Sequence, residues 1–328
     1  MPSQFPNKKV CLLLAGGTAL AENDSTPIQT EADVAPWLKK LTELAIIGEI
    51  TPVFICGEEN RLLGQVLWQK LSQTIFERLN DFDGFVVTSI SPDLLYNALA
   101  LSFALQNLNK PVVFIGSPLL AVHKNLIEAK KVSLNGLGLR ASLINAIQIA
   151  TMPFGAVGLV FGKFCLRAVK TPHIDLYSLN IFGAPDESYL AKIDFSFSLF
   201  EPLALPSGTT TLKNNFAAKV LSVDYYPGLD FEAFKKSIQG AAGVMLKGLS
   251  FAPLDESFLE KLKKLSIPVL VYNRFYVPPL NGDNLIECYN LTKQTALIKF
   301  IWALGQTSDL AEIRGLMAKE FCGEFLKT

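Results

Sequence analysis

Apolar positions in the first half of the chain alternate between short runs and stretches with helical spacing. Short apolar runs indicate strands, and they lie at Val10–Leu14, Ile50–Cys56, Phe85–Val87, Val112–Ile115 and Ala156–Phe161. Apolar residues three and four positions apart indicate helices, here at Ala32–Ile46, Leu62–Leu79, Leu94–Leu108 and Leu139–Ala150. Strands that alternate with helices are typical of a mainly parallel sheet flanked by helices.

A second, smaller α/β pattern follows a segment that contains many Pro, Ser, Thr and Asn residues. This segment, 194–215, is typical of a linker. Beyond it, strands are expected at Val220–Val223, Gly243–Leu246 and Val269–Tyr272, and helices at Phe231–Gln239, Leu254–Leu265, Thr292–Ala303 and Asp309–Glu320. The sequence therefore predicts an α/β protein with a larger domain at 1–193 and a smaller one at 216–328, which a length of 328 residues accommodates.

Charge and composition narrow the classes of partner. Thirty basic residues balance thirty acidic ones, and no run of like charges stands out, so the sequence has no nucleic-acid-binding footprint. Half of the residues are apolar, yet no uncharged apolar stretch is long enough to span a membrane. These properties favour a small, neutral or zwitterionic ligand.

The N-terminal run after Lys8-Lys9, VCLLLAGGTALA, is open to two interpretations. It resembles a short secretory signal, and it also fits a first buried strand that ends in a glycine turn. The strand is favoured because Gly16-Gly17 interrupts the apolar region after about six residues, below the usual roughly 7–15 of a signal core. The five cysteines are dispersed, without metal or redox spacing, and there are two histidines. We therefore expect a cytoplasmic protein with no metal site and no cofactor.

The segment Asp83–Ser117 predicts one strand-helix-strand unit. Open α/β sheets bind ligands at the carboxyl ends of their strands. A loop expected at Thr88–Asp93 lies at that edge, which makes it the first candidate for a binding site.

Several short motifs, in this order and spacing, resemble the bacterial L-asparaginase family, its cytosolic-type members most of all. Ala15-Gly16-Gly17-Thr18 resembles the TGGT turn, and Arg167-Ala168-Val169-Lys170 resembles an R-x-x-K segment. The stretches DGFVV and ALSFALQNLNKPVVFIGS resemble the surroundings of the HGTDT motif, and Tyr226-Pro227-Gly228, Met317-Ala318 and Gly323-Glu324 extend the similarity into the second domain. The resemblance implies a two-domain asparaginase-like fold and a homodimer or homotetramer.

The resemblance also implies hydrolysis of a side-chain amide through a threonine nucleophile, which gives an acyl-enzyme intermediate and ammonia. Thr18 matches the first family threonine, Ser91 falls on the second, and Lys170 matches the lysine that activates it. A hydroxyl needs an adjacent base and oxyanion donors to react. The alternative is that Gly16-Gly17-Thr18 is only a tight turn and that Lys170 is an ordinary surface lysine.

Two of the matched substrate-binding positions hold different chemistry. Ser89 falls on the family's histidine, and Pro92 falls on the aspartate that would bind an ammonium group. Proline has neither a charge nor a backbone N–H. Asp93 replaces the missing charge only if it faces the crevice. Ser91-Pro92-Asp93 also reads as a helix start, with Ser91 as N-cap, Pro92 in the first helical position and Asp93 at the positive helix end.

A third difference lies in the loop Cys56–Asn60. Here the family uses a serine and then an acidic or amide residue to hold the substrate's α-carboxylate and ammonium. Glu59 keeps an acid, whereas Glu58 would repel a carboxylate. The alternative is that both glutamates cap or solvate the next helix.

Three further segments differ from the family pattern. Leu137-Gly138-Leu139 replaces an SDG segment, and 248–253 replaces a G-x-G-N turn. The polar stretch Glu22–Thr30 resembles a lid but lacks the tyrosine that often works there.

Two functions follow from these residues. The first is an amide hydrolase with a changed substrate or with reduced or lost activity on L-asparagine. The second is a catalytically silent homologue that binds a small ligand or acts as an interaction partner. A nucleotide site is disfavoured, because the turn after the first strand is neither G-x-G-x-x-G nor a P-loop.

Overall fold

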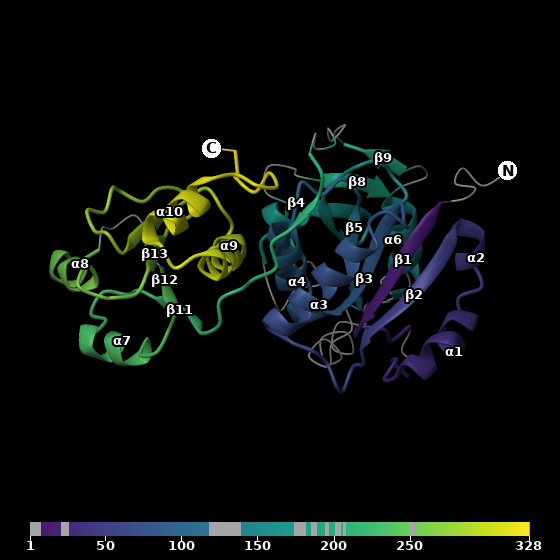
Figure 1. The fold of residues 1–328 in the computed structure, drawn as a ribbon, viewed down its shortest axis with the longest axis horizontal. Coiled ribbons are helices and arrows are strands. Elements are labelled where there is room, and N and C mark those ends of the chain that lie inside the picture. The colour runs from purple at the N-terminus through teal and green to yellow at the C-terminus, as the bar shows by residue number, and fades with distance from the viewer. Residues whose placement is uncertain are drawn as a thin grey trace, which may run out of the picture. The chain divides into compact units, whose positions relative to one another are not determined.

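The computed structural model describes residues 8–20, 26–117, 139–173, 182–184, 189–193, 197–200, 205, 208–248 and 254–327, with backbone alone for Ser91, Pro92, Ser117 and Phe197. The chain divides into two compact units, Met1–Leu212 and Lys213–Thr328 (Figure 1). The division falls inside the segment 194–215, part of which forms short strands.

The N-terminal unit is built on an eight-stranded sheet within the described residues, in the order β2-β1-β3-β5-β6-β7-β8-β9. Its strands are β1 (Lys9–Ala15), β2 (Glu49–Cys56), β3 (Gly84–Ile90), β5 (Val112–Ser117), β6 (Val157–Phe161), β7 (Phe164–Arg167), β8 (Tyr189–Ile193) and β9 (Phe197–Leu199). The first five in this order are parallel, and the pairs from β6 to β9 are antiparallel. The predicted mainly parallel sheet is confirmed, while the antiparallel extension β7–β9 was not predicted.

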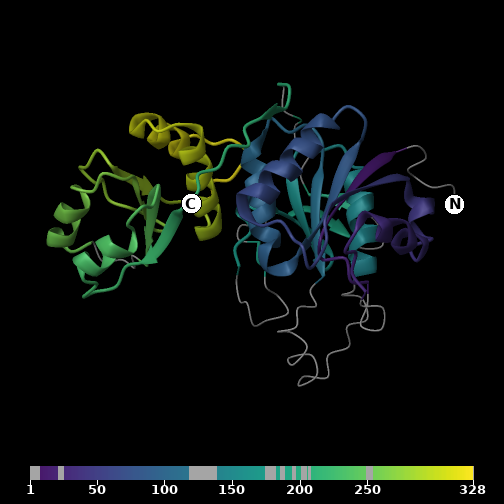
Figure 2. The ribbon, with the colours of Figure 1, turned by 60° about the horizontal axis from the view of Figure 1, so that its bottom comes forward.

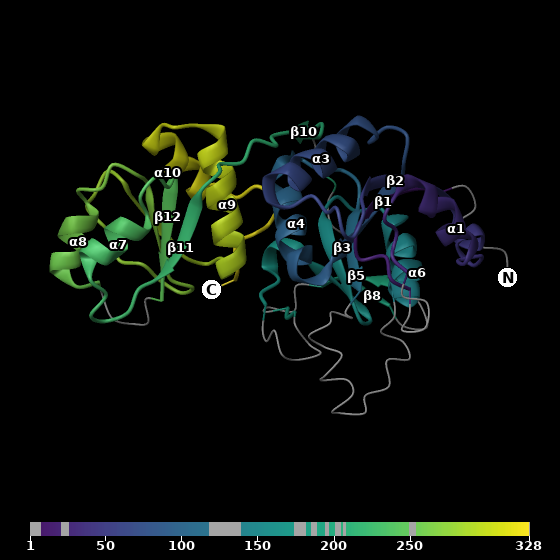
Figure 3. The same ribbon diagram turned by 90° about the horizontal axis from the view of Figure 1, so that it is seen from below.

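Helices cover both faces of this sheet. Figure 3 shows α3 (Gly64–Glu77) and α4 (Ser91–Ala104) on one face, and α1 (Val34–Lys39) and α6 (Leu139–Ala150) on the other. Val10, Leu12 and Leu14 of β1 pack into the same core as α6. All of Val10–Ala15 is buried, which explains why β1 is a continuous apolar run rather than an alternating one.

Two predicted helices differ in the structure. The helix expected at Ala32–Ile46 is broken into a 3-10 turn (Glu31–Asp33), α1, and α2 (Leu44–Ile47). The break follows α1, where the Lys40 and Leu41 N–H groups bond three residues back and tighten the chain.

The helix expected to reach Leu108 ends at Ala104. The next two residues form β4 (Leu105–Gln106), which pairs with β10 (Thr211–Leu212). Asn107 then takes a left-handed conformation, with φ 54°. Pairing with a strand more than a hundred positions away cannot be inferred from local helical spacing.

The C-terminal unit contains a four-stranded parallel sheet in the order β11-β12-β13-β14. Its strands are β11 (Val220–Asp224), β12 (Gly243–Lys247), β13 (Val269–Tyr272) and β14 (Leu285–Cys288), and its helices are α7 (Phe231–Ser237), α8 (Glu256–Leu262), α9 (Lys293–Gln306) and α10 (Leu310–Ala318). Figures 2 and 3 show its strands between α7 and α8 on one side and α9 and α10 on the other. All three predicted strands and all four predicted helices are confirmed, with shifted ends, and β14 is new.

Each of these four helices begins at a side-chain cap. Asp230, Asp255, Thr292 and Asp309 accept a hydrogen bond from a backbone N–H three residues on. This satisfies one otherwise unpaired donor per helix and fixes where each helix starts.

A buried ion pair holds the C-terminal segment to α9. Lys299 Nζ donates to Glu324 Oε1 at 2.8 Å, and both side chains are 0% exposed. Glu324 also accepts from the backbone N–H groups of Phe321 and Cys322. Burial would raise the pKa of Glu324, but the Lys299 ammonium and the N–H donors more than offset it, so the pKa lies below its ordinary value of 4.5.

None of the helices in the described parts of the chain has the length and hydropathy that a membrane crossing requires.

Candidate functional site

The glycine turn after β1 lies against the end of the neighbouring strand β3. Gly16 and Gly17 have φ values of 80° and 67°, which favour glycine. A Cβ on Gly17 would lie 2.2 Å from the Ser89 carbonyl oxygen. Because Gly17 has no side chain, the turn that carries Thr18 can pack directly against the backbone of β3.

We expect Gly17→Ala to lower the free energy of unfolding by about 2–5 kcal/mol, the sum of left-handed backbone strain and overpacking. Gly162→Ala is the matched control, because Gly162 has φ 58° and a Cβ there meets nothing within 4 Å. The control should lose only the part that comes from left-handed backbone strain, about 1–2 kcal/mol of the free energy of unfolding. Urea unfolding of the two variants measures the difference, and equal losses would contradict the close packing of the turn.

Thr18 is buried behind this turn. Its side chain is 1% exposed, and its Oγ1 accepts a hydrogen bond from the Ile28 N–H at 2.8 Å. The indole N–H of Trp37 donates to the Thr18 carbonyl at 2.9 Å. The hydroxyl thus holds the described part of the predicted lid, residues 26–30, against the turn.

Glu58 reaches the same turn from the carboxyl end of β2. Its Oε2 accepts from the Gly17 N–H at 2.8 Å, and the side chain is half-buried. Its backbone N–H donates to the Ile28 carbonyl at 3.3 Å. The helix α3 begins only at Gly64, with Leu63 as its N-cap, so the Glu58 carboxylate bonds to the Thr18 turn rather than to that helix.

Glu59 and Asp93 lie at more exposed positions. The Glu59 N–H donates to Gln29 Oε1 at 3.0 Å, while its side chain is exposed. Asp93, in the first turn of α4, lies 3.7 Å from Arg61. Both side chains of that pair are more than a third exposed, so we assign it little energetic weight. Asp93 therefore has a cationic neighbour, Arg61.

The expected loop at Thr88–Asp93 is wrong. Thr88 to Ile90 continue β3, and α4 begins directly at Ser91. The N-cap is Ile90, not Ser91, and Pro92 lies in the first turn, where its missing N–H has no helical partner to lose. The side chains of Ser91 and Pro92 lie outside the described residues.

Ser89 belongs to a buried hydrogen-bond chain that the sequence did not predict. Its Oγ accepts from Asn97 Nδ2 at 2.9 Å, and Asn97 Oδ1 accepts from Trp68 Nε1 at 2.8 Å. Ser89 is 1% exposed and Asn97 is buried. The sequence feature that could have pointed to this chain is Asn97, a polar residue among the apolar residues of α4. This chain links β3, α4 and α3 and fixes the orientation of Ser89.

Lys170 lies at the end of a 3-10 turn, Ala168–Lys170, that follows β7. Lys170 is half-buried, and it interacts with another residue of the chain. Three residues further on, the His173 ring lies 5.9 Å from the Tyr96 ring and stacks on Phe182. Tyr96 lies in the second turn of α4, so Lys170 and Ser91 are on neighbouring segments, and His173 is part of an aromatic cluster.

Several predicted features fall outside the described residues. They are Leu137 and Gly138, residues 249–253 and residues 21–25. Among the residues that are described, no group of three or more His, Cys, Asp or Glu side chains could hold a metal ion.

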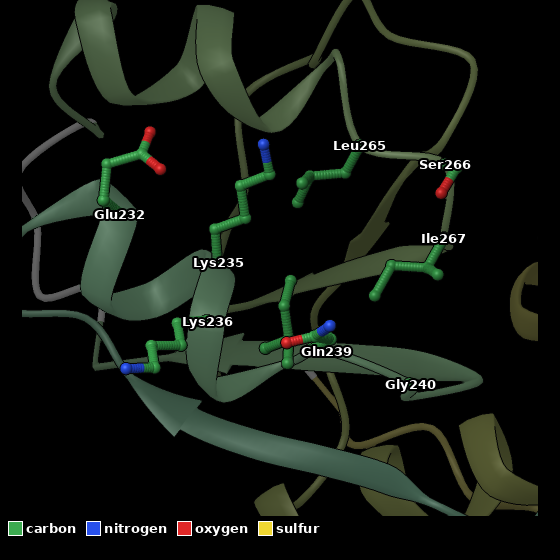
Figure 4. A pocket seen from close by; sticks show the side chains of 9 residues that line it. Glu232, Lys235, Lys236, Gln239, Gly240, Leu265, Ser266 and Ile267 are labelled. Atoms are coloured by element: carbon green, nitrogen blue, oxygen red, sulfur yellow. The ribbon is translucent and has the colours of Figure 1, made fainter.

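The C-terminal unit has a hollow of its own, of about 580 Å³. Figure 4 shows Glu232, Lys235 and Lys236 of α7 on one side and the loop Leu265–Ile267 on the other. None of the residues that match the asparaginase motifs lines it.

Comparison with known proteins relates this chain to asparaginases. The family model described as asparaginase, N-terminal, matches residues 9–203. One of the subunits of the glutamyl-tRNA(Gln) amidotransferase of Thermococcus kodakarensis is 24% identical, over 99% of this chain and 78% of its own length. The L-asparaginase of the same organism is 25% identical, over 78% of this chain and 80% of its own length.

The solved structure of L-asparaginase I from Vibrio cholerae has a TM-score of 0.79 to this chain at 22% identity, and the match covers 98% of this chain and 100% of that one. This likeness confirms the predicted two-domain asparaginase fold. Because the family model spans more than half of the chain and begins on β1, the chain belongs to the asparaginase family.

Proposed function

We propose that this asparaginase-family protein hydrolyses a primary amide through Thr18 and has reduced or lost activity on free L-asparagine. The observation that carries the proposal is the contact between the Gly16-Gly17-Thr18 turn and the end of β3. Because α4 starts directly after β3, this contact supports a site in which Thr18 and Ser91 belong to adjacent strand ends. The names of relatives that are L-asparaginases support the same reaction class.

In the proposed reaction, Thr18 Oγ1 attacks the amide carbon and forms an ester as the carbon–nitrogen bond breaks. The hydroxyl proton leaves with the nitrogen as ammonia. Water then hydrolyses the ester, which restores the Thr18 hydroxyl and releases a carboxylic acid. Ser91 and Lys170 would relay the proton, and the neighbouring positions of their segments support this role.

Reduced activity on L-asparagine rests on two residues. Pro92 supplies no charge where the family's aspartate would bind an ammonium group. Glu58 places a carboxylate on the Gly17 N–H, 2.8 Å away, near the position expected for the substrate's α-carboxylate. The attraction lost at Pro92 and the repulsion added by Glu58 both weaken the binding of L-asparagine, which is a zwitterion.

Ammonia release across a panel of primary amides tests the proposal. The panel contains L-asparagine, L-glutamine and amides that are neutral or cationic. We expect at least one amide to be turned over, and L-asparagine to be slower than the best of them by about 100-fold. A flat response across the panel would contradict amide hydrolysis, and L-asparagine as the best substrate would contradict the altered preference.

The second candidate function is a catalytically silent homologue that binds a small ligand or a partner protein. It is favoured by one observation: the Thr18 hydroxyl is 1% exposed and is already bonded to the Ile28 N–H. A relative named as part of an amidotransferase agrees with a role beside another protein. A flat ammonia panel together with a ligand-induced rise in the unfolding temperature would favour this function.

We further propose a cytoplasmic homodimer or homotetramer without metal or cofactor. The assembly rests on the family resemblance. The compartment rests on the five cysteines, which are all free thiols in the described residues.

A further inference from the structure

The most unusual group at the proposed site is the Glu58 carboxylate. Within the described residues its one hydrogen bond is the 2.8 Å contact from the Gly17 N–H to Oε2. No Lys, Arg or His in those parts of the chain forms an ion pair with it. The nearby guanidinium of Arg61 lies instead against Asp93, at 3.7 Å. Within the described residues, the Glu58 carboxylate therefore has no ion-pair partner beside the turn of Thr18.

The position of this charge limits what can bind there. The side chain is half-buried, so water screens it less than an exposed carboxylate. A ligand carboxylate about 4 Å away would be repelled enough to weaken binding by about 10-fold or more. An ammonium group at the same place would be attracted to a similar degree. Among the described residues no donor bonds to the second oxygen, Oε1, which can accept a hydrogen bond from that group.

We infer that Glu58 selects a primary amide that carries an ammonium group and no free carboxylate. The simplest such ligand is 3-aminopropanamide, which is asparagine without its α-carboxylate. Amides of longer amines, and asparagine whose α-carboxylate is blocked as an ester or amide, belong to the same class. The inference takes the location of the site from the proposed function, and it adds the charge of the ligand.

Titration calorimetry with three ligands tests the inference. The ligands are 3-aminopropanamide, L-asparagine and the neutral propanamide. We expect the wild-type protein to bind 3-aminopropanamide at least about 10-fold more tightly than either of the others. The preference over propanamide should shrink as salt is added, because ions screen the charge.

The variant Glu58→Gln removes the charge and keeps the shape. Its amide oxygen can still accept from the Gly17 N–H, so the Thr18 turn should keep its position. The variant should lose about 10-fold in affinity for 3-aminopropanamide and change by less than about twofold for propanamide. Glu77→Gln, an exposed position on α3, makes the same change in net charge and should leave all three affinities unaltered.

Three results would overturn the inference. They are equal or tighter binding of L-asparagine by the wild type, an unchanged ligand order in Glu58→Gln, and no binding of 3-aminopropanamide at millimolar concentration. Ammonia release separates this inference from the proposed function. Glu58-dependent binding without ammonia would refute hydrolysis alone, while turnover of other amides with no preference for the cation would refute the inference alone.

Discussion

Replacing Thr18 by alanine is expected to reduce ammonia release from the best amide by about 1,000-fold or more, because the variant lacks the nucleophilic oxygen. The fold should survive the change. Within the described residues the hydroxyl makes one hydrogen bond, from the Ile28 N–H, and its loss should lower the free energy of unfolding by about 1–3 kcal/mol. Steady-state ammonia release and urea unfolding of the same preparation measure both effects.

Thr18→Ser is the matched control for that variant. Serine keeps the oxygen that accepts from Ile28 and that attacks the amide, so it should retain far more activity than alanine. Turnover by Thr18→Ala at the wild-type rate would show that the hydroxyl serves only to hold residues 26–30 on the turn. Loss of turnover in Thr18→Ala, with turnover kept in Thr18→Ser, would support hydrolysis through this buried hydroxyl.

Replacing Lys299 by methionine is expected to lower the free energy of unfolding by about 3–5 kcal/mol, because it leaves the Glu324 carboxylate buried without its cation. Both side chains are 0% exposed, so water cannot take the place of the lost ammonium group. Lys293→Met is the control, because Lys293 is exposed on the same helix α9. Urea unfolding at neutral pH should separate the two variants, and similar small losses would contradict a structural role for the ion pair.

The pH dependence of this loss has a definite sign. In the wild type the pKa of Glu324 is lowered from 4.5, so its stabilising contribution is present above that value and is lost as pH falls through the lowered pKa. Without Lys299, burial dominates and raises the pKa of Glu324. The deficit of Lys299→Met should then be largest at neutral pH. It should begin to shrink above pH 4.5, as the solution passes through the raised pKa of the variant, and shrink further below 4.5 as the wild type loses its own contribution. A deficit that grows on acidification would contradict the ion pair as its cause.

The sequence predicts the parallel sheets well because buried parallel strands are nearly continuous apolar runs. Val10–Leu14 is such a run, and it forms the strand β1 with neighbours on both sides. The antiparallel strands β7 to β9 were missed because they are short and mixed in polarity. β7 pairs with β6 directly before it, whereas β8 pairs with β7 across more than twenty residues of chain.

The site was harder to predict than the fold. Motif resemblance identified Thr18 and Glu58, but their partners lie at positions that only the folded chain brings together. The Gly17–Glu58 hydrogen bond joins residues 41 positions apart, and the Ser89–Asn97–Trp68 chain crosses from a strand to two helices. Local capping rules placed the start of α4 within one residue. They could not show that β3 continues to Ile90 and leaves no loop between strand and helix.

The most direct test of the account is a crystal structure of the protein with 3-aminopropanamide at saturating concentration. We predict that the ligand lies at the carboxyl ends of β1 and β3, with its ammonium group within hydrogen-bond distance of Glu58 and its amide carbon facing Thr18. Ligand density elsewhere, such as the hollow beside α7, or no density at all, would contradict it.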